Sequence, residues 1–214
     1  NAGADVVEIN AWNHPVPPIV DADALVVLGG SMSCQDDAEA PWLAPTRQLI
    51  SRTVRAGTPF LGICLGHQLA TVALGGQVCT SDHFCLGAAE MHLTPEGKKD
   101  PLLSVYDGHR GIHFNNDVAV VLPEDAVLLA RDPTGQIEAV RFAERAWGVQ
   151  FHPECTPEIF DAWTIGHGEK EWQQRLPWSE AVTVAETVRR DIDTVNAEEA
   201  FAARFQELID PEKR

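Results

Sequence analysis

Residues 59–68 read Pro59-Phe60-Leu61-Gly62-Ile63-Cys64-Leu65-Gly66-His67-Gln68, and the expected fold is built outward from them. The apolar run over residues 59–63 is typical of a buried strand, and residues 65–74 have the pattern of a helix that ends at a glycine pair. A second apolar run, 24–28, also ends at two glycines and suits a strand buried on both faces. A helix is expected between the runs, over residues 41–56. Buried strands that alternate with helices predict a parallel sheet with helices on both faces.

The middle and the end of the chain have different patterns. Turn residues separate several short β-type segments in the middle, which predicts a mixed or antiparallel section of sheet. After Pro177 the chain becomes charged, and two segments carry apolar residues at helical spacing. We therefore expect an α/β domain over residues 1–170 and an accessory C-terminal helical tail over residues 171–214. The short strands are expected at 5–9, 90–94, 118–122, 127–130, 137–142 and 147–151, and the tail helices at 183–195 and 197–209.

The composition restricts the class of protein. Of the 214 residues, 44% are hydrophobic and 22% are charged, as expected for a globular chain, and the sequence contains no apolar run of about 18 residues that would predict a membrane-spanning helix. The formal charge of −16 argues against binding to nucleic acid or to an anionic membrane, because both favour a basic surface. The five cysteines include no Cys-x-x-Cys pair, so neither a disulfide framework nor a zinc site is expected. We expect a cytoplasmic protein with reduced thiols.

Two separated motifs hold the candidate catalytic groups. Cys64 lies where a strand turns into a helix, so the turn lifts its side chain clear of the sheet and the positive end of the helix points at the sulfur. His152 and Glu154 follow another predicted strand and supply a base for the thiol and a carboxylate to orient that base. The backbone N–H of Leu65 and a donor from residues 29–33 are suited to an oxyanion hole. Each motif alone would more often be structural, but the two together favour one site.

These motifs resemble the class I, or triad-type, glutamine amidotransferases, and the stand-alone GMP-synthase-like members most closely. The resemblance covers about residues 5–165 and implies a flavodoxin-like α/β fold. It implies that Cys64 attacks the side-chain amide of glutamine, that His152 acts as general base and then acid, and that Glu154 orients His152. It also implies oxyanion donors at Gly30 and Leu65 and substrate contacts at Ser31, Met32 and Gln68. The matching segments are residues 29–33, 62–68, 93–97, 117–123 and 148–154.

The sequence departs from that family at three places. Asn115 stands where the family often begins a His-x-Asp sequence, the strand and helix expected before Asn1 are absent from the sequence, and the tail after about Trp172 has no clear counterpart. The sequence has no P-loop, so amidotransfer requires a separate synthetase partner that receives the ammonia. The alternatives are a γ-glutamyl peptidase or hydrolase that acts alone on a small conjugate, and a non-catalytic binding relative. The amphipathic tail is also suited to a homodimer contact.

Other candidate residues carry weaker signals. His109 and His113 are four residues apart, but Gly108 and Gly111 predict a loop there, so neither a metal nor another cofactor is expected. The regular spacing of metal ligands is absent from a second group, Cys79, His83 and Cys85. We interpret a third group as packing for the tail: Trp163, Trp172 and Trp178.

Overall fold

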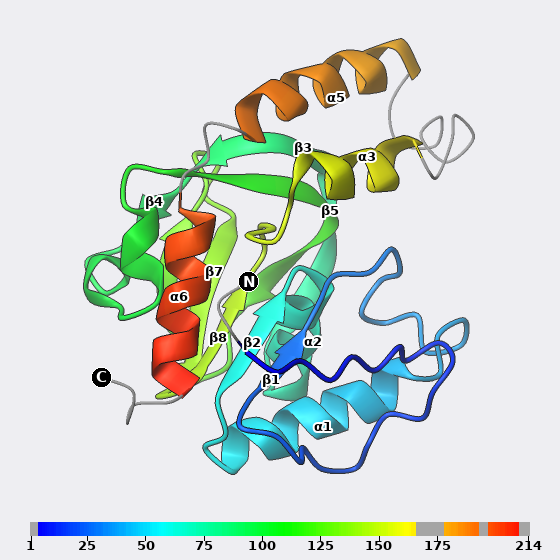
Figure 1. Ribbon diagram of the computed structural model, residues 1–214, viewed down its shortest axis with the longest axis vertical. Coiled ribbons are helices and arrows are strands. Elements are labelled where there is room, and N and C mark those ends of the chain that lie inside the picture. The colour runs from blue at the N-terminus through cyan, green and yellow to red at the C-terminus, as the bar shows by residue number, and fades with distance from the viewer. Residues whose placement is uncertain (1–3, 166–177, 193–196, 210–214) are drawn as a thin grey trace.

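A six-stranded mixed sheet forms the centre of the computed structural model, which describes residues 4–165, 178–192 and 197–209 (Figure 1). The strand order is β1-β2-β8-β7-β6-β4, and β1, β2 and β8 run parallel. Because β7 is antiparallel to both of its neighbours, β6 runs in the same direction as β8, while β4 opposes β6. Four of the six strands share one direction, which confirms the mostly parallel α/β sheet. The strands are β1 Leu25–Val27, β2 Phe60–Ile63, β4 His92–Leu93, β6 Val127–Arg131, β7 Ile137–Ala143 and β8 Ala146–Val149.

Helices cover both faces of this sheet. α1 (Leu43–Arg55) and α2 (Leu65–Ala73) pack on one face, and α6 (Glu198–Ile209) packs on the other (Figure 1). Neighbouring residues along a strand point to opposite faces, so each face has its own core cluster. The cluster beneath α1 and α2 includes Leu43, Ile50, Phe60, Leu69, Val140 and Phe142. The cluster beneath α6 includes Leu61, Leu129, Trp147, Val149, Phe151, Phe201 and Phe205.

A separate antiparallel ribbon lies beside the sheet. It pairs β3 (Gln77–Glu90) with β5 (Arg110–Val121), and the register shifts between Thr80 and Cys85. The helices α3 (Pro157–Ile165) and α5 (Trp178–Ile192) lie over this ribbon at the top of Figure 1. A small core cluster joins the three parts and contains Ile112, Cys155, Phe160 and Val188. Two 3₁₀ turns, Gly97–Lys99 and Leu103–Tyr106, complete the described elements.

The N-terminal part differs from its sequence prediction in two ways. Residues 4–10 form no strand, and Val6 and Val7 are 81% and 84% exposed. A strand there is a wrong prediction, because no strand in the described chain pairs with this backbone. The sequence also predicts burial of β1 on both faces, but β1 lies at the edge of the sheet and Val26 is 44% exposed. Apolar sequence therefore identifies β1 as a strand without fixing its place in the sheet.

The sequence pattern predicts a strand for residues 118–122, at the end of β5, but it does not indicate the rest of the ribbon or the helix α3. The glycines predict a loop over residues 108–113, but β5 begins at Arg110 and continues through His113. Gly111 lies inside this strand because a β-carbon there would lie only 2.8 Å from the ring of Phe151. The glycine marks close packing of a strand against a side chain rather than a turn.

The two tail helices pack on the rest of the molecule. Val188 of α5 is buried in the ribbon cluster, and Arg110 Nη1 lies 2.9 Å from Asp191 Oδ2 of the same helix. On the other side, Phe201 of α6 packs edge-on against Tyr106, with ring centroids 5.6 Å apart. α5 begins five residues before the predicted helix start, at Trp178. The predicted residues 193–195 and Trp172 lie outside the described residues.

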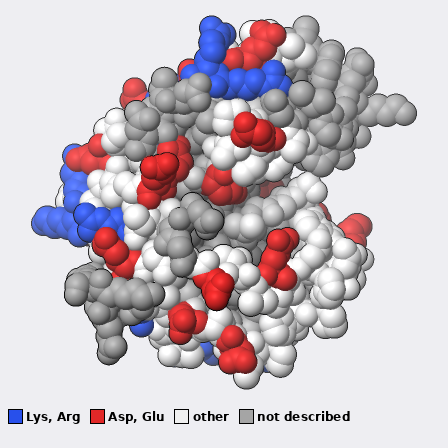
Figure 2. Space-filling model, viewed as in Figure 1, with Lys and Arg blue, Asp and Glu red and all other residues white. Residues whose placement is uncertain are grey.

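Acidic side chains are spread over the face of the molecule shown in Figure 2, whereas Lys and Arg gather near its upper and left edges. This distribution agrees with the net charge of −16. Within the residues that the structure describes, no helix has both the length and the hydropathy needed to cross a membrane.

Candidate active site

Cys64 lies at the sharp turn between β2 and α2 and has an unusual backbone conformation. Its φ is 50° and its ψ is −106°, and no other non-glycine residue in the described chain has a positive φ. This conformation is strained for a residue that carries a side chain, and such strain is concentrated at functional sites. Cys64 is also the N-cap of α2, so the unpaired N–H groups of the first helical turn surround it.

Two glycines allow this turn to pack against the sheet. A β-carbon at Gly66 would lie 2.0 Å from the carbonyl oxygen of Val27, and one at Gly62 would lie 2.5 Å from the carbonyl oxygen of Gly66. Atoms cannot approach so closely, so any side chain at these positions would push α2 away from β1 and β2. The backbone N–H of Cys64 donates to Val149 O at 2.8 Å and holds the turn beside the end of β8.

His152 and Glu154 follow β8 and lie next to this turn. His152 Nδ1 is 2.8 Å from Glu154 Oε1, and the His152 backbone N–H donates to Ile112 O at 2.8 Å. The His152 side chain is 5% exposed, and its Nε2 is buried without a hydrogen-bond partner. A β-carbon on Gly29 would lie 3.0 Å from His152 Cε1 and 3.5 Å from Cys64 Cβ, so this glycine leaves room for both side chains. The two motifs that the sequence separates by 88 residues thus meet at one point in space.

The neighbours of His152 determine its charge. Burial lowers the pKa of His152, but the charge of Cys64 and the hydrogen bond and charge of Glu154 raise it by more, and the result is a pKa of about 10. His152 is therefore protonated on both ring nitrogens at neutral pH when Cys64 and Glu154 are negatively charged. Glu154 Oε1 accepts a hydrogen bond from Nδ1, so Nε2 is the ring nitrogen left to exchange a proton.

The loop after β1 lies against one side of the Cys64–His152 site. A β-carbon on Gly30 would lie 2.8 Å from Leu65 Cδ2 and 2.9 Å from Met32 Sδ, so these three residues are in close contact. Ser31 lies in the same loop and is exposed. The structure thus brings Gly30, Met32 and Leu65 together beside Cys64, while Ser31 faces solvent.

Asp117 ties this loop to the ribbon. Its Oδ2 accepts a hydrogen bond from Ser33 Oγ at 2.5 Å, and its Oδ1 accepts one from Thr80 Oγ1 at 2.9 Å. The Asp117 backbone carbonyl accepts a hydrogen bond from Gln68 Nε2 at 2.8 Å, and Gln150 Oε1 lies 3.3 Å from the same nitrogen. Gln68 is 3% exposed, so its amide group forms part of the buried wall between α2 and β5.

Asn115, the position that departs from the family pattern, belongs to this wall. Its Nδ2 donates to Asp117 O at 3.2 Å, and its Oδ1 is buried without a hydrogen-bond partner. An asparagine here can offer an amide oxygen where a histidine would offer a ring. The side chain therefore changes the hydrogen-bonding groups on this side of the site.

The histidine pair considered for a metal has another role in the structure. His113 Nε2 is 2.7 Å from Glu138 Oε2, and its Nδ1 is 3.0 Å from Gly111 O, so both ring nitrogens are engaged. Among the described residues, no group of three or more His, Cys, Asp or Glu side chains is placed to hold a metal ion. Cys85 Sγ lies 3.4 Å from Gln136 Oε1, and none of the five cysteines forms a disulfide.

Trp163 lies at the site, although the sequence suggested only packing for the tail. Its ring centroid is 4.5 Å from that of His152, with an interplanar angle of 58°. Trp163 also contacts Phe114, at a centroid distance of 5.8 Å. The signal that could have indicated this contact is the position of Trp163 in the helix directly after the His152 motif. The side chain of Trp178 is not among the described ones.

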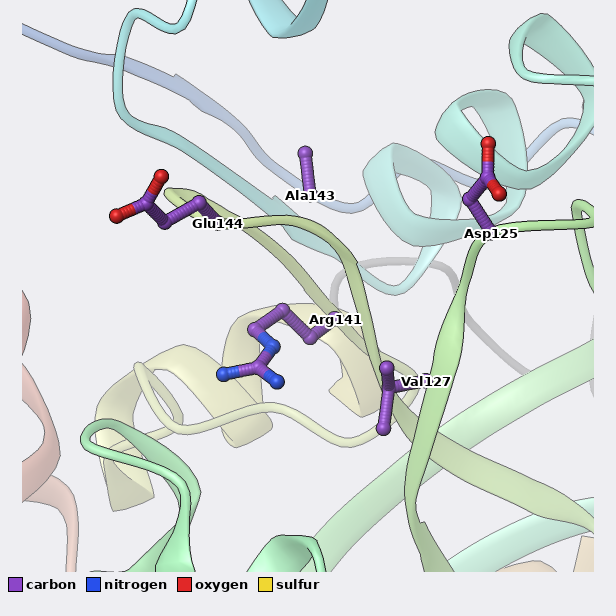
Figure 3. Close-up of a pocket in the computed structure, with 5 residues that line it drawn as sticks. All are labelled: Asp125, Val127, Arg141, Ala143 and Glu144. Atoms are coloured by element: carbon purple, nitrogen blue, oxygen red, sulfur yellow. The ribbon is translucent and has the colours of Figure 1, made fainter.

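A cavity elsewhere in the molecule is not this site. It has a volume of about 290 Å³ and lies where β6 and β7 meet the turn before β8 (Figure 3). In the close-up, Glu144 lies at the left and Asp125 at the right, and the side chain of Arg141 extends to the left below Glu144. None of the residues predicted from the motifs lines the cavity, whose lining residues are Asp125, Val127, Arg141, Ala143 and Glu144.

The family model for glutamine amidotransferase class-I matches residues 3–166. The chain belongs to the class-I glutamine amidotransferase family. A glutamine amidotransferase-like protein of Salmonella typhimurium, YfeJ, is 32% identical over 161 residues, which are 73% of this chain and 66% of that protein. One subunit of a glutamine-hydrolysing GMP synthase from Halobacterium salinarum is 30% identical over 153 residues, which are 70% of this chain and 76% of that subunit.

Solved structures show the same fold. A glutamine amidotransferase from Thermotoga maritima superimposes with a TM-score of 0.73 at 21% identity, covering 88% of this chain and 78% of that one. At that identity the likeness establishes the amidotransferase fold alone, and it confirms the flavodoxin-like α/β arrangement. The chain matches only 38% of the length of a glutamine-hydrolysing GMP synthase from Tolumonas auensis.

Proposed function

We propose that this amidotransferase chain hydrolyses the side-chain amide of glutamine through a covalent intermediate on Cys64. The thiol proton passes to His152 Nε2, and the sulfur attacks the amide carbon of the substrate. A C–S bond forms, and the electron pair of the C=O bond moves to the oxygen. The backbone N–H groups of Gly30 and Leu65 are the proposed donors to this oxyanion. The raised pKa of His152, about 10, favours uptake of the proton.

The next steps release ammonia and glutamate. The tetrahedral intermediate collapses, the C–N bond breaks, and His152 gives its proton to the leaving nitrogen, so ammonia departs and a γ-glutamyl thioester remains. A water then attacks the thioester while His152 accepts its proton, the C–S bond breaks, and the proton returns to the sulfur. Glu154 keeps Nδ1 protonated and so leaves Nε2 as the reacting nitrogen.

The single observation that carries this proposal is the strained turn at Cys64 beside the His152–Glu154 pair. A buried cysteine with only a structural role needs no positive φ. It also needs no neighbouring histidine whose pKa is raised by the cysteine, as Cys64 raises that of His152. Both features are expected of an activated thiol nucleophile at a helix N-terminus. The substrate pocket is proposed to include Ser31, Met32 and Gln68.

The fate of the ammonia is the second part of the proposal. The relatives include a GMP synthase subunit and GMP synthases named as glutamine-hydrolysing. We propose that this chain passes its ammonia to a separate synthetase, and that both act in the cytoplasm. The surfaces of α5 and α6 are proposed as a contact between two copies, in a homodimer. The domain division at about residue 170 remains a proposal as well.

The test measures glutamate release by the purified chain from glutamine and from a panel of γ-glutamyl amides and peptides. We expect glutamine to be hydrolysed and Cys64→Ala to remove the activity. Cys79→Ala, which removes an exposed thiol on β3, serves as the matched control and should match the wild type. A Cys64→Ala variant that kept full activity would refute the mechanism.

The same assay distinguishes the alternatives. Turnover of a γ-glutamyl conjugate but not of glutamine would indicate a γ-glutamyl hydrolase that acts alone, for which the buried free oxygen of Asn115 is the structural argument. Failure of a glutamine-mimicking alkylator to label Cys64, together with no turnover of any substrate, would indicate a binding protein. A rise in glutamine turnover on addition of a co-purified synthetase would support the partner.

A further inference from the structure

The environment of the His152 ring includes an aromatic side chain that no step of the proposed mechanism uses. Trp163 lies with its ring centroid 4.5 Å from that of His152, inside the range of about 6 Å over which a cation and an aromatic ring attract each other. The protonated His152 is such a cation, because its pKa is raised to about 10. The contact is therefore one between a charged ring and the largest aromatic side chain.

One hydrogen bond does not hold an imidazole in place. The Nδ1 to Glu154 Oε1 bond fixes one point of the ring, but the ring can still turn about that bond and carry Nε2 away from Cys64. Gly29 has no side chain to limit this motion, since the β-carbon of any other residue would lie 3.0 Å from Cε1. The close indole of Trp163 supplies the second contact that limits it.

Trp163 is itself held by packing that involves several elements. Its ring meets Phe114 of the ribbon at 5.8 Å, and Phe114 in turn lies 6.5 Å from Phe160 of the same helix, α3. Phe160 is 0% exposed and shares a cluster with Val188 of α5, which is 1% exposed. The indole position is thus determined by β5, α3 and α5 together, and not by a mobile loop.

We propose that Trp163 is a positioning residue that fixes the plane of the His152 ring and stabilises its protonated form. This inference rests on the proposed function, because it assigns a role within that reaction. Trp163 touches His152 and acts through it on the step in which Nε2 takes and returns a proton. The tail helix α5 then supports the site at a distance, by holding α3 in place.

Other groups also act on the charge of His152, and the test must separate them from Trp163. Cys64 and Glu154 both raise the pKa of His152, and they come from the turn before α2 and from the same motif as the histidine. His113 of β5 is close enough for the two histidines to repel each other when both are charged. Variants at position 163 leave these three groups unchanged.

The experiment compares Trp163→Leu and Trp163→Phe with a control, Trp42→Leu. Trp42 is also partly buried and also pairs with an aromatic ring, that of Trp12 at 5.6 Å, but it does not contact His152. The pKa of His152 is measured by NMR titration of the full chain, and kcat and KM for glutamine are measured over the same pH range.

We expect Trp163→Leu to lower the pKa of His152 by about half to one unit, the range that an aromatic contact with a cation implies. We expect kcat to fall roughly tenfold with little change in KM, since a misplaced ring weakens proton transfer rather than substrate binding. Trp163→Phe should give values between those of Trp163→Leu and the wild type, because its ring is smaller, and Trp42→Leu should match the wild type.

The inference is overturned if the titration of His152 is the same in the wild type and in both Trp163 variants. If Trp163→Leu does not fold, Trp163→Phe alone decides, because its smaller ring must still lower the pKa measurably. A wild-type chain that turns over no glutamine would refute the proposed function, whereas the titration would still test the role of Trp163.

Discussion

His152 and His67 are both buried within one small region of the structure, yet their pKa values move in opposite directions. His67 lies in α2 three residues after Cys64, is 0% exposed, and has no hydrogen-bond partner for either ring nitrogen. Its ring stacks on Phe142 at a centroid distance of 5.8 Å, and burial lowers its pKa to about 4. Burial acts on His152 in the same direction, but Cys64 and Glu154 raise its pKa to about 10.

Charged partners, and not burial, therefore separate the reactive histidine from the packing one. His113 is a third case: burial lowers its pKa, but Glu138 raises it more, so the pKa lies above the ordinary value. His113 has a carboxylate partner but no thiol beside it. Among these three histidines, only His152 has both a carboxylate at one ring nitrogen and a cysteine near the other.

The largest effect is expected when the reactive histidine itself is removed. His152→Asn should lower kcat for glutamine by roughly 10⁴-fold or more, because the proton taken from Cys64 then has no acceptor. Steady-state kinetics measures this loss. The matched control is His67→Leu, which removes the other buried histidine and should leave kcat within about threefold of the wild type. Equal losses in the two variants would contradict the distinction between them.

Removal of the carboxylate should have the next largest effect. Glu154→Gln keeps the size of the side chain but removes a charge that raises the pKa of His152, so that pKa should fall. We expect kcat to decrease by about 10²- to 10⁴-fold, as when the orienting carboxylate of a triad is neutralised. NMR titration and the pH dependence of kcat measure the two effects. A titration of His152 that does not change would show that Glu154 is not its electrostatic partner.

The third histidine should matter for stability rather than for chemistry. His113→Leu leaves the Glu138 carboxyl, 1% exposed, without its partner, so we expect a loss of about 3 kcal/mol in the free energy of unfolding. Urea denaturation measures this loss. The double variant His113→Leu/Glu138→Leu removes the stranded carboxyl and should recover much of the stability. A double variant less stable than the single one would argue against the buried pair as the cause.

The sequence predicted the Cys64 turn well because its determinants are local. Gly62, Cys64 and Gly66 lie within five residues, and the glycines are required because a β-carbon at either one would lie 2.0–2.5 Å from a backbone oxygen. The apolar runs on either side specify a strand and a helix in the same way. The His152–Glu154 pair is also local, since the two residues are separated only by Pro153.

Beyond the strand at residues 118–122, the ribbon and its contacts could not be predicted, because they depend on distant parts of the chain. β3 pairs with β5 across a register shift between Thr80 and Cys85, which interrupts the alternation that would identify a strand. Trp163 meets His152 only because the ribbon, α3 and α5 pack together. The edge position of β1 is likewise set by strand order and not by its apolar sequence.

The sequence around His67 also gives no sign of its environment, and the smallest of the expected effects tests it. Between about pH 6.5 and 4, unfolded His67 takes up a proton that the folded state excludes, so its contribution to stability is present above pH 6.5 and is lost as the pH falls toward 4. A pKa lowered from 6.5 to about 4 corresponds to about 3 kcal/mol in all, of which about 2 kcal/mol is lost between pH 7 and pH 4.5.

His67→Leu should therefore lose less stability than the wild type on acidification, as urea denaturation at those two pH values would measure. Glu138, His113 and the other titrating groups are the same in both proteins, so they cancel in this difference. Parallel loss of stability in the two proteins would mean that His67 is protonated in the folded chain, and the contrast with His152 would then disappear.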